Sequence, residues 1–288
     1  MIQHKPVLLN EIVKFFDNLT SDKEKIFGDF TLGFGGHSEE ILKNFPNVKL
    51  IGIDRDIETL KIAKEKLSNF KERVSYYQLS FGDFDKVLNI KFDGVLLDLG
   101  VNSMQLISNE RGFSFNSQSK LDMRMDRTQE LSAWEVVNYY PPQELERVFR
   151  EYADVKYPKR IVQAIIRARQ KKKIDTCKEL NDIINSFFKR RGRINPATKF
   201  FQAIRIEVNN ELEELKKFLE KIWSFLNIGA RLAIISFHSL EDRIVKYAFK
   251  RDGVKILTKK PITPSYEEIK QNPRARSAKL RVCEWQGF

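Results

Sequence analysis

The chain is poor in the residues that build disulfide frameworks, metal sites and membrane spans. Its 288 residues include only two cysteines, Cys177 and Cys283, which lie too far apart in sequence to indicate a disulfide framework. Its three histidines, His4, His37 and His238, form no metal-binding motif. No apolar run approaches the roughly 20 residues that span a bilayer. We therefore expect a cytoplasmic protein without a metal, a signal peptide or a membrane segment.

Acidic residues are also scarce relative to basic ones. The 39 Asp and Glu against 51 Lys and Arg leave a net charge of +12, and 42% of the residues are hydrophobic, enough for a large core. Between Lys156 and Arg193 the chain has thirteen Lys and Arg but only three acids, a net charge of +10. Such a block suits contacts with a phosphate backbone, so we expect a nucleic acid partner. The alternative is a solvated, lysine-rich face.

Short apolar runs bounded by turn residues predict the strands of an α/β protein with a parallel sheet. Between the fourth and fifth runs, apolar residues recur with helical spacing, as in Leu145, Val148 and Phe149. We therefore expect a discontinuous sheet domain, 1–105 and 199–288, with an all-helical domain, 106–198, inserted at the sheet edge where ligands bind. The predicted strands are 26–30, 48–53, 74–79, 92–97, 231–236, 254–257 and 280–284.

Glycines gather in one turn between a predicted strand and a predicted helix. Gly33, Gly35 and Gly36 allow the backbone to approach a ligand, and Asp54, about 20 residues further on, can accept two ribose hydroxyls. The spacing lacks the third glycine of a dinucleotide turn, because Ser38 stands there. It favours S-adenosylmethionine over NAD, and a purely conformational turn is the remaining alternative.

Several ordered segments carry a resemblance to one family. They are Gly-Phe-Gly-Gly-His-Ser at 33–38, Gly-Ile-Asp-Arg-Asp at 52–56, Leu-Asp-Leu-Gly-Val-Asn-Ser at 97–103, Arg-Ile-Asn-Pro at 193–196 and Ser-Phe-His-Ser-Leu-Glu-Asp-Arg at 236–243. Over nearly its whole length the chain resembles the bacterial small-subunit (16S) ribosomal RNA cytosine-N4 methyltransferases, the RsmH or MraW family. This resemblance implies a Rossmann-like class I S-adenosylmethionine-dependent methyltransferase sheet with an inserted all-helical domain.

The resemblance also assigns the S-adenosylmethionine pocket. Judged by the sequence alone, Phe84 follows the third predicted strand, where a side chain could cover a base, but ordinary core packing is the better interpretation. The contacts implied by the resemblance are Gly35, Gly36 and His37 with the methionine portion, Asp54 with the ribose, Phe84 with the adenine, and Asp98 and Gln105 completing the pocket, beside the glycine turn that begins at Gly33.

The amino group of cytosine is a poor nucleophile, so hydrogen-bond acceptors are expected beside it. Asp98 ends the fourth predicted strand and is the best-placed acceptor, with Asn102 and Ser103 as neighbours. These residues are our catalytic candidates together with His238. For Asp98 the alternative is a role as cofactor ligand only.

His238 follows the fifth predicted strand, at the same edge of the sheet. We expect His238 and Asp242 to shape the RNA pocket, and the alternative is that Ser239 or Asp242 caps a helix. A Ser/His/Asp hydrolase is excluded, because the chain has no Gly-x-Ser-x-Gly turn.

The expected partner is ribosomal RNA or the small ribosomal subunit, and a homodimer stays open. Two other functions also remain: a non-catalytic RNA-binding assembly factor, and a DNA amino-methyltransferase, which the absence of Pro-Pro after Asp98 disfavours. The predicted RNA contacts are Lys171, Lys172, Lys173, Arg190, Arg191, Arg193, Arg274 and Arg276.

Overall fold

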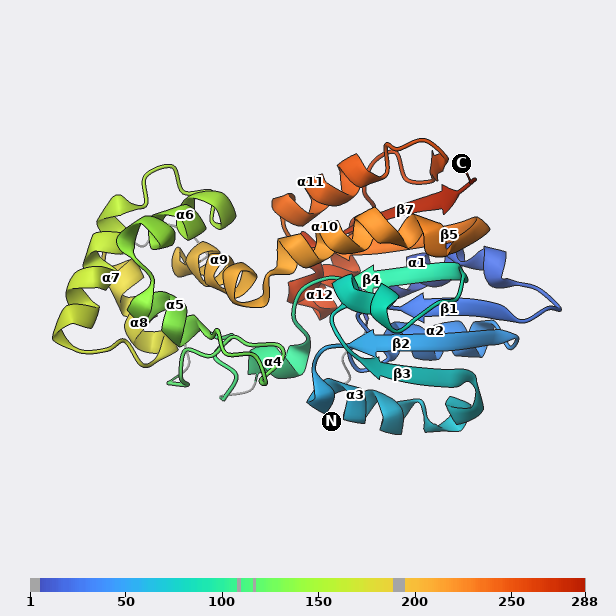
Figure 1. Cartoon of the computed structure of the whole chain (residues 1–288), viewed down its shortest axis with the longest axis horizontal. Coiled ribbons are helices and arrows are strands. Elements are labelled where there is room, and N and C mark those ends of the chain that lie inside the picture. Colours follow the sequence, from blue (N-terminus) through green and yellow to red (C-terminus); the bar gives the residue numbers. More distant parts are fainter. Residues whose placement is uncertain (1–5, 108–109, 116–117, 189–194, 288) are drawn as a thin grey trace. The chain divides into compact units, whose positions relative to one another are not determined.

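The chain forms two compact units. The structure is a computed structural model that describes residues 6–107, 110–115, 118–188 and 195–287. One unit comprises Met1–Gly100 and Leu212–Phe288 and holds the whole sheet, so we call it the sheet unit (Figure 1). The other, Val101–Glu211, is the helical unit. Among the described residues, no helix combines the length and the apolar composition that crossing a membrane requires.

A seven-stranded sheet organises the sheet unit. The strand order is β3-β2-β1-β4-β5-β7-β6, and all neighbours are parallel except β7, which runs antiparallel to β5 and β6. This order confirms the predicted α/β, Rossmann-like class, and each predicted strand coincides with an observed one. The strands are β1 (Lys25–Asp29), β2 (Val48–Asp54), β3 (Val74–Gln78), β4 (Phe92–Asp98), β5 (Leu226–Ser236), β6 (Val254–Ile256) and β7 (Lys279–Trp285).

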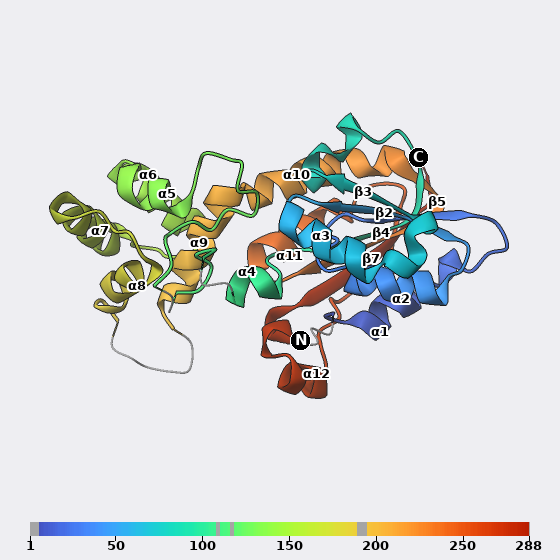
Figure 2. The same ribbon diagram turned by 90° about the horizontal axis from the view of Figure 1, so that it is seen from below.

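Helices cover both faces of the sheet, as Figures 1 and 2 show. Successive residues of β4 alternate between two cores: Leu96 packs with α1, α2 and α3, whereas Val95 and Leu97 pack with α10 and α11. Burial on both faces explains why the central strands read as continuous apolar runs. The helices are α1 (Leu9–Phe15), α2 (Gly36–Asn44), α3 (Ile57–Lys66), α10 (Glu211–Lys221), α11 (Ser239–Ala248) and α12 (Tyr266–Gln271).

The helical unit has its own apolar core. The helical periodicity predicted for its middle part is observed, because Leu145, Val148 and Phe149 are fully buried on α6. Helix α9 contributes Phe200 and Ile204 to the same core. The helices are α4 (Ser103–Ile107), α5 (Ala133–Tyr139), α6 (Pro142–Tyr152), α7 (Lys159–Lys171), α8 (Cys177–Asn185) and α9 (Ala197–Asn209).

The limits of the units differ from those expected from the sequence. The sequence places the inserted domain at 106–198, whereas the compact helical unit extends from Val101 to Glu211. The physical reason lies in α9, whose apolar residues pack against α5, α6 and α8. The chain returns to the sheet unit after Glu211, the residue that follows Asn210, which caps α9 in the left-handed conformation with φ of 51°.

Candidate cofactor and substrate site

Three parallel strands of the sheet unit end in an aspartate. Asp29 ends β1, Asp54 ends β2 and Asp98 ends β4. Because β1 lies between β2 and β4, the three carboxylates share the carboxyl edge of the sheet. The sequence identified Asp54 and Asp98 as site residues but not Asp29. The signal was present, since Asp54 and Asp98 directly follow their predicted strands and Asp29 lies near the end of the first one.

Asp54 holds the glycine turn in place. Its Oδ2 accepts a hydrogen bond from the backbone N–H of Gly33 at 2.9 Å, and its Oδ1 accepts one from the N–H of Asp56 at 2.9 Å. Gly33 and Gly35 have φ of 54° and 72°, a region that favours glycine, and Gly35 is the N-cap of α2. The carboxylate therefore fixes the turn and keeps further acceptor capacity for a ligand.

Side-chain hydrogen bonds tie the ends of β1 and β4 together. Ser38 donates from Oγ to Asp29 Oδ2 at 2.6 Å, which joins α2 to β1. Thr31 Oγ1 accepts from the backbone N–H of Asp98 at 2.6 Å. Neither Ser38 nor Thr31 was among the predicted site residues. Their role is visible only in the fold, where they hold the two carboxylates at fixed positions.

Asp98 is the least satisfied of the three carboxylates. Its Oδ1 is buried and accepts no hydrogen bond within the described part of the chain, although the side chain is 26% exposed. Its Oδ2 lies 3.9 Å from Nδ1 of His37, whose Nε2 lies 2.8 Å from the carbonyl oxygen of Val7. A buried acceptor without a donor is costly, so the site is suited to a ligand that supplies positive charge or an N–H.

Burial of these acids changes their protonation. It raises the pKa of both Asp29 and Asp54 to about 6. It raises the pKa of Asp98 to about 8, and the negative charges of Asp29 and Glu241 add to this shift. The surroundings therefore disfavour the ionised forms of these carboxyl groups, most strongly that of Asp98. A cationic ligand fits such a place, whereas the pyrophosphate of a dinucleotide would be repelled.

The structure does not bring Phe84 to this site. The side chain is 0% exposed and packs between Phe30, Phe218 and Phe225. Phe84 belongs to the core on the α10 and α11 face of the sheet, and its expected contact with the adenine stays a prediction. Its position after β3 was compatible with both roles, and the aromatic partners that bury it come from distant parts of the chain.

Asn102, Ser103 and Gln105 belong to the helical unit and form the start of α4. The backbone N–H of Asn102 donates to Gln105 Oε1 at 3.0 Å, and that of Gln105 donates to Asn102 Oδ1 at 2.9 Å. The two side chains thus cap the short helix reciprocally. The side chain of Ser103 lies outside the described part of the structure.

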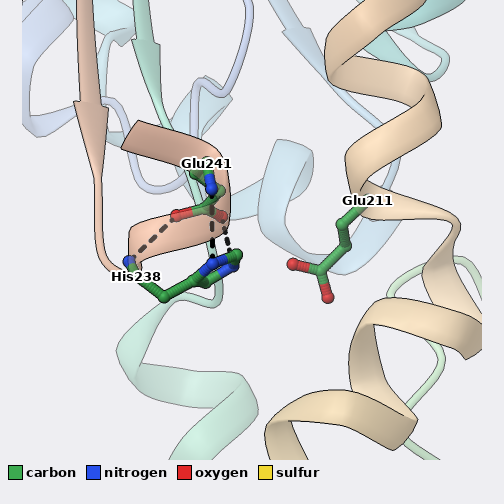
Figure 3. Close-up of side chains that lie close together, drawn as sticks. All are labelled: Glu211, His238 and Glu241. Carbon is green, nitrogen blue, oxygen red and sulfur yellow. Dashed lines mark hydrogen bonds and ion pairs between the residues drawn. The ribbon is translucent and has the colours of Figure 1, made fainter. Parts of the chain in front are cut away.

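His238 is the N-cap of α11. Its Nδ1 accepts from the backbone N–H of Glu241 at 3.4 Å, and Oε2 of Glu241 accepts from the backbone N–H of His238 at 3.3 Å (Figure 3). The same Oε2 accepts from the backbone N–H of Phe237 at 2.8 Å. The expected alternative, a cap at Ser239 or Asp242, is wrong because the helix begins one residue after His238. Asp242 instead accepts from Arg281 Nε at 2.7 Å, which ties α11 to β7.

Two substitutions of His238 separate its capping role from a role in substrate binding. His238→Ala should lower the free energy of unfolding by about 1 kcal/mol, because the cap is lost. His238→Asn keeps a good N-cap residue and should restore stability, measured by urea denaturation, but not the rate of methyl transfer. A parental rate of methyl transfer in His238→Asn would mean that His238 acts only as the N-cap of α11.

The predicted RNA contacts fall into three groups. Lys171 and Lys173 are exposed at the end of α7, whereas Lys172 pairs with Glu179 at 2.9 Å. Arg274 and Arg276 are exposed on either side of the buried Ala275, in the 3-10 helix Pro273–Ser277. Arg190, Arg191 and Arg193 lie outside the described residues.

Comparison with known proteins identifies the family. A profile of the MraW methylase family matches residues 1–286. The chain is 51% identical to a "Ribosomal RNA small subunit methyltransferase H" of Persephonella marina, covering 99% of both chains. It is 48% identical to proteins of the same name from Sulfurihydrogenibium sp., with 98% of this chain and 99% of the relative covered, and from Caldicellulosiruptor saccharolyticus, with 99% of each covered.

These matches confirm the resemblance inferred from the motifs. They also confirm the expected class of enzyme, a methyltransferase, and with it S-adenosylmethionine as the cofactor, which fits the acidic edge and the glycine turn. Because the match covers residues 1–286, this chain belongs to the MraW methylase family.

Proposed function

We propose that the protein transfers a methyl group from S-adenosylmethionine to the N4 amino group of a cytosine in small-subunit ribosomal RNA. The observation that carries this proposal is Asp98, a carboxylate at the cofactor edge with one buried oxygen that lacks a donor among the described residues. The names of the relatives support the RNA substrate. Action on the ribosome places the protein in the cytoplasm.

The cofactor supplies a methyl group on a positively charged sulfur. Asp54, which holds the glycine turn, would accept hydrogen bonds from the ribose hydroxyls, and His37 in the first turn of α2 would contact the methionine portion. Asp98 in its ionised form accepts a hydrogen bond from the amino group of the cytosine, which localises the nitrogen lone pair for attack. Asn102, Ser103 and His238 are proposed to orient the base.

RNA binding is supported by the basic residues of both units. Lys171 and Lys173 on the helical unit, and Arg274 and Arg276 on the sheet unit, have exposed side chains. Each phosphate that such a residue neutralises releases counterions, so RNA affinity should fall steeply as salt increases. No other role is required for this excess of positive charge.

Transfer of a labelled methyl group tests the function directly. The full chain is incubated with labelled S-adenosylmethionine and, in parallel, assembled small subunits, protein-free ribosomal RNA and duplex DNA. We expect label in one of the two ribosomal substrates, and N4-methylcytidine after digestion and mass spectrometry. Label on another position, label on DNA alone, or binding of RNA without any transfer would contradict the proposal.

A further inference from the structure

An exposed aromatic surface lies on the helical unit, at the junction of α5 and the end of α7. Tyr139, the last residue of α5, is 59% exposed although it is a large aromatic side chain. The Nζ of Lys173 lies over its ring, 4.0 Å from the centroid, and the ring of Trp134 contacts it edge-on at 5.3 Å between centroids. We call these three residues the tyrosine–lysine surface.

Neighbouring residues hold this surface in place, and the nearby acid, Asp175, is already hydrogen-bonded to Trp134. Arg169 donates to the carbonyl oxygens of Val137 and Tyr140 at 2.8 Å, which satisfies the C-terminus of α5 around Tyr139. Asp175 accepts from Nε1 of Trp134 at 3.0 Å. Lys173 forms no ion pair with any described residue, because the nearby Asp175 lies next to Lys172, 4.0 Å from its Nζ, so no ion pair has to break when Lys173 contacts a phosphate.

We propose that the tyrosine–lysine surface binds single-stranded RNA, with a base stacked on Tyr139 and the adjacent phosphate on Lys173. This inference rests on the proposed ribosomal RNA substrate and adds a specific contact to it. Aromatic rings stack on any base, and a lysine beside the ring that has no described ion pair supplies the charge that the backbone requires. The alternative of a protein partner is less suited to this site, because this lysine has no described ion pair and the segment 156–193 is strongly basic.

The stacking contact of Tyr139 and the phosphate contact of Lys173 should affect RNA binding differently. The probe is a fluorescein-labelled, 12-nucleotide single-stranded RNA of mixed sequence, and its anisotropy is measured with the full chain at several salt concentrations. Tyr139→Ala should weaken binding at least about fivefold without changing the salt dependence, whereas Tyr139→Trp should retain the affinity. Lys173→Gln should reduce the slope of log affinity against log salt by about 0.7.

A matched control is available on the sheet unit. Tyr247 is 63% exposed and has Nζ of Lys250 at 5.3 Å from its ring centroid, so Tyr247→Ala removes a comparable exposed pair. Its RNA affinity should equal that of the parent. Unchanged affinity in Tyr139→Ala, or an equal loss in Tyr247→Ala, would overturn the inference. Methyl transfer to small subunits by the parent is measured on the same preparations, so failure of the proposed function would be seen separately.

Discussion

Asp98→Asn is expected to reduce the rate of methyl transfer by at least about a hundredfold, because an amide cannot replace a carboxylate as a strong acceptor for the attacking amine. Single-turnover transfer at saturating cofactor and small subunits isolates this step. The fold of the variant should be intact, because Asn has nearly the shape of Asp and because the Oδ1 of Asp98 has no described donor to lose.

The same residue should make cofactor binding depend on pH. With a pKa of about 8 the Asp98 carboxyl is mostly protonated at pH 7, and a cationic ligand favours its ionised form. Binding of S-adenosylmethionine should therefore release up to about one proton at pH 7. Titration calorimetry in buffers with different ionisation enthalpies measures this number. S-adenosylhomocysteine, which lacks the sulfonium charge, should release fewer protons, and Asp98→Asn should abolish the difference.

Loss of activity should be accompanied by a gain in stability. The native pKa of Asp98 lies above the ordinary value of 3.8, so its contribution to stability is complete only below about pH 4 and is lost as the pH rises to about 8. Asp98→Asn stays neutral throughout. The difference in the free energy of unfolding between the variant and the parent should grow from about pH 4 to about pH 8. It should reach a few kcal/mol in order of magnitude and remain constant at higher pH.

Thermal unfolding of the two proteins at pH 4, 6, 8 and 9 checks this dependence. Asp22→Asn, at an exposed aspartate of the sheet unit, is the control and should show no such trend. An Asp98→Asn variant that transfers methyl groups at the parental rate would show that Asp98 is not the acceptor. A stability difference that does not change with pH would show that the pKa of Asp98 is not raised in the folded protein.

The strands of the sheet could be predicted from the sequence because the signal for each strand lies in its own consecutive residues. Strands buried on both faces must be continuously apolar, so β4 is recognisable from Val95, Leu96 and Leu97 alone. The rule that parallel strands end at one edge then places Asp54 and Asp98 together. The same rule applies to Asp29, which was not among the predicted site residues.

Other features depend on partners that the sequence does not specify. The buried state of Phe84 follows from Phe218 and Phe225, more than a hundred residues away. The periodicity of α9 indicates an apolar face but does not say which core it enters, so the limit of the inserted domain was placed too early for the compact unit. The alternative of a cap at Ser239 or Asp242 missed His238 because histidine is an unusual N-cap and serine and aspartate are preferred ones.

Asp54→Ala is expected to weaken S-adenosylmethionine binding by at least about a hundredfold. The substitution removes the acceptor for the ribose and also the anchor of the glycine turn, since Oδ2 of Asp54 holds the backbone N–H of Gly33 and Oδ1 that of Asp56. Hydrogen bonds to a charged group contribute roughly 1.5 to 3 kcal/mol each, so loss of two at the ligand accounts for this factor. Titration calorimetry with the full chain measures the dissociation constant.

Asp54→Asn distinguishes the two contributions. Its side chain offers one acceptor oxygen, while its amide group would face a second N–H donor, so one of the two backbone contacts must be lost. We expect an affinity between those of the parent and Asp54→Ala, and Asp22→Ala should bind like the parent. Parental affinity in Asp54→Ala would mean that neither a ribose contact of Asp54 nor its hydrogen bonds to the turn contribute to binding, and the cofactor would then have to be held by other residues of the sheet edge.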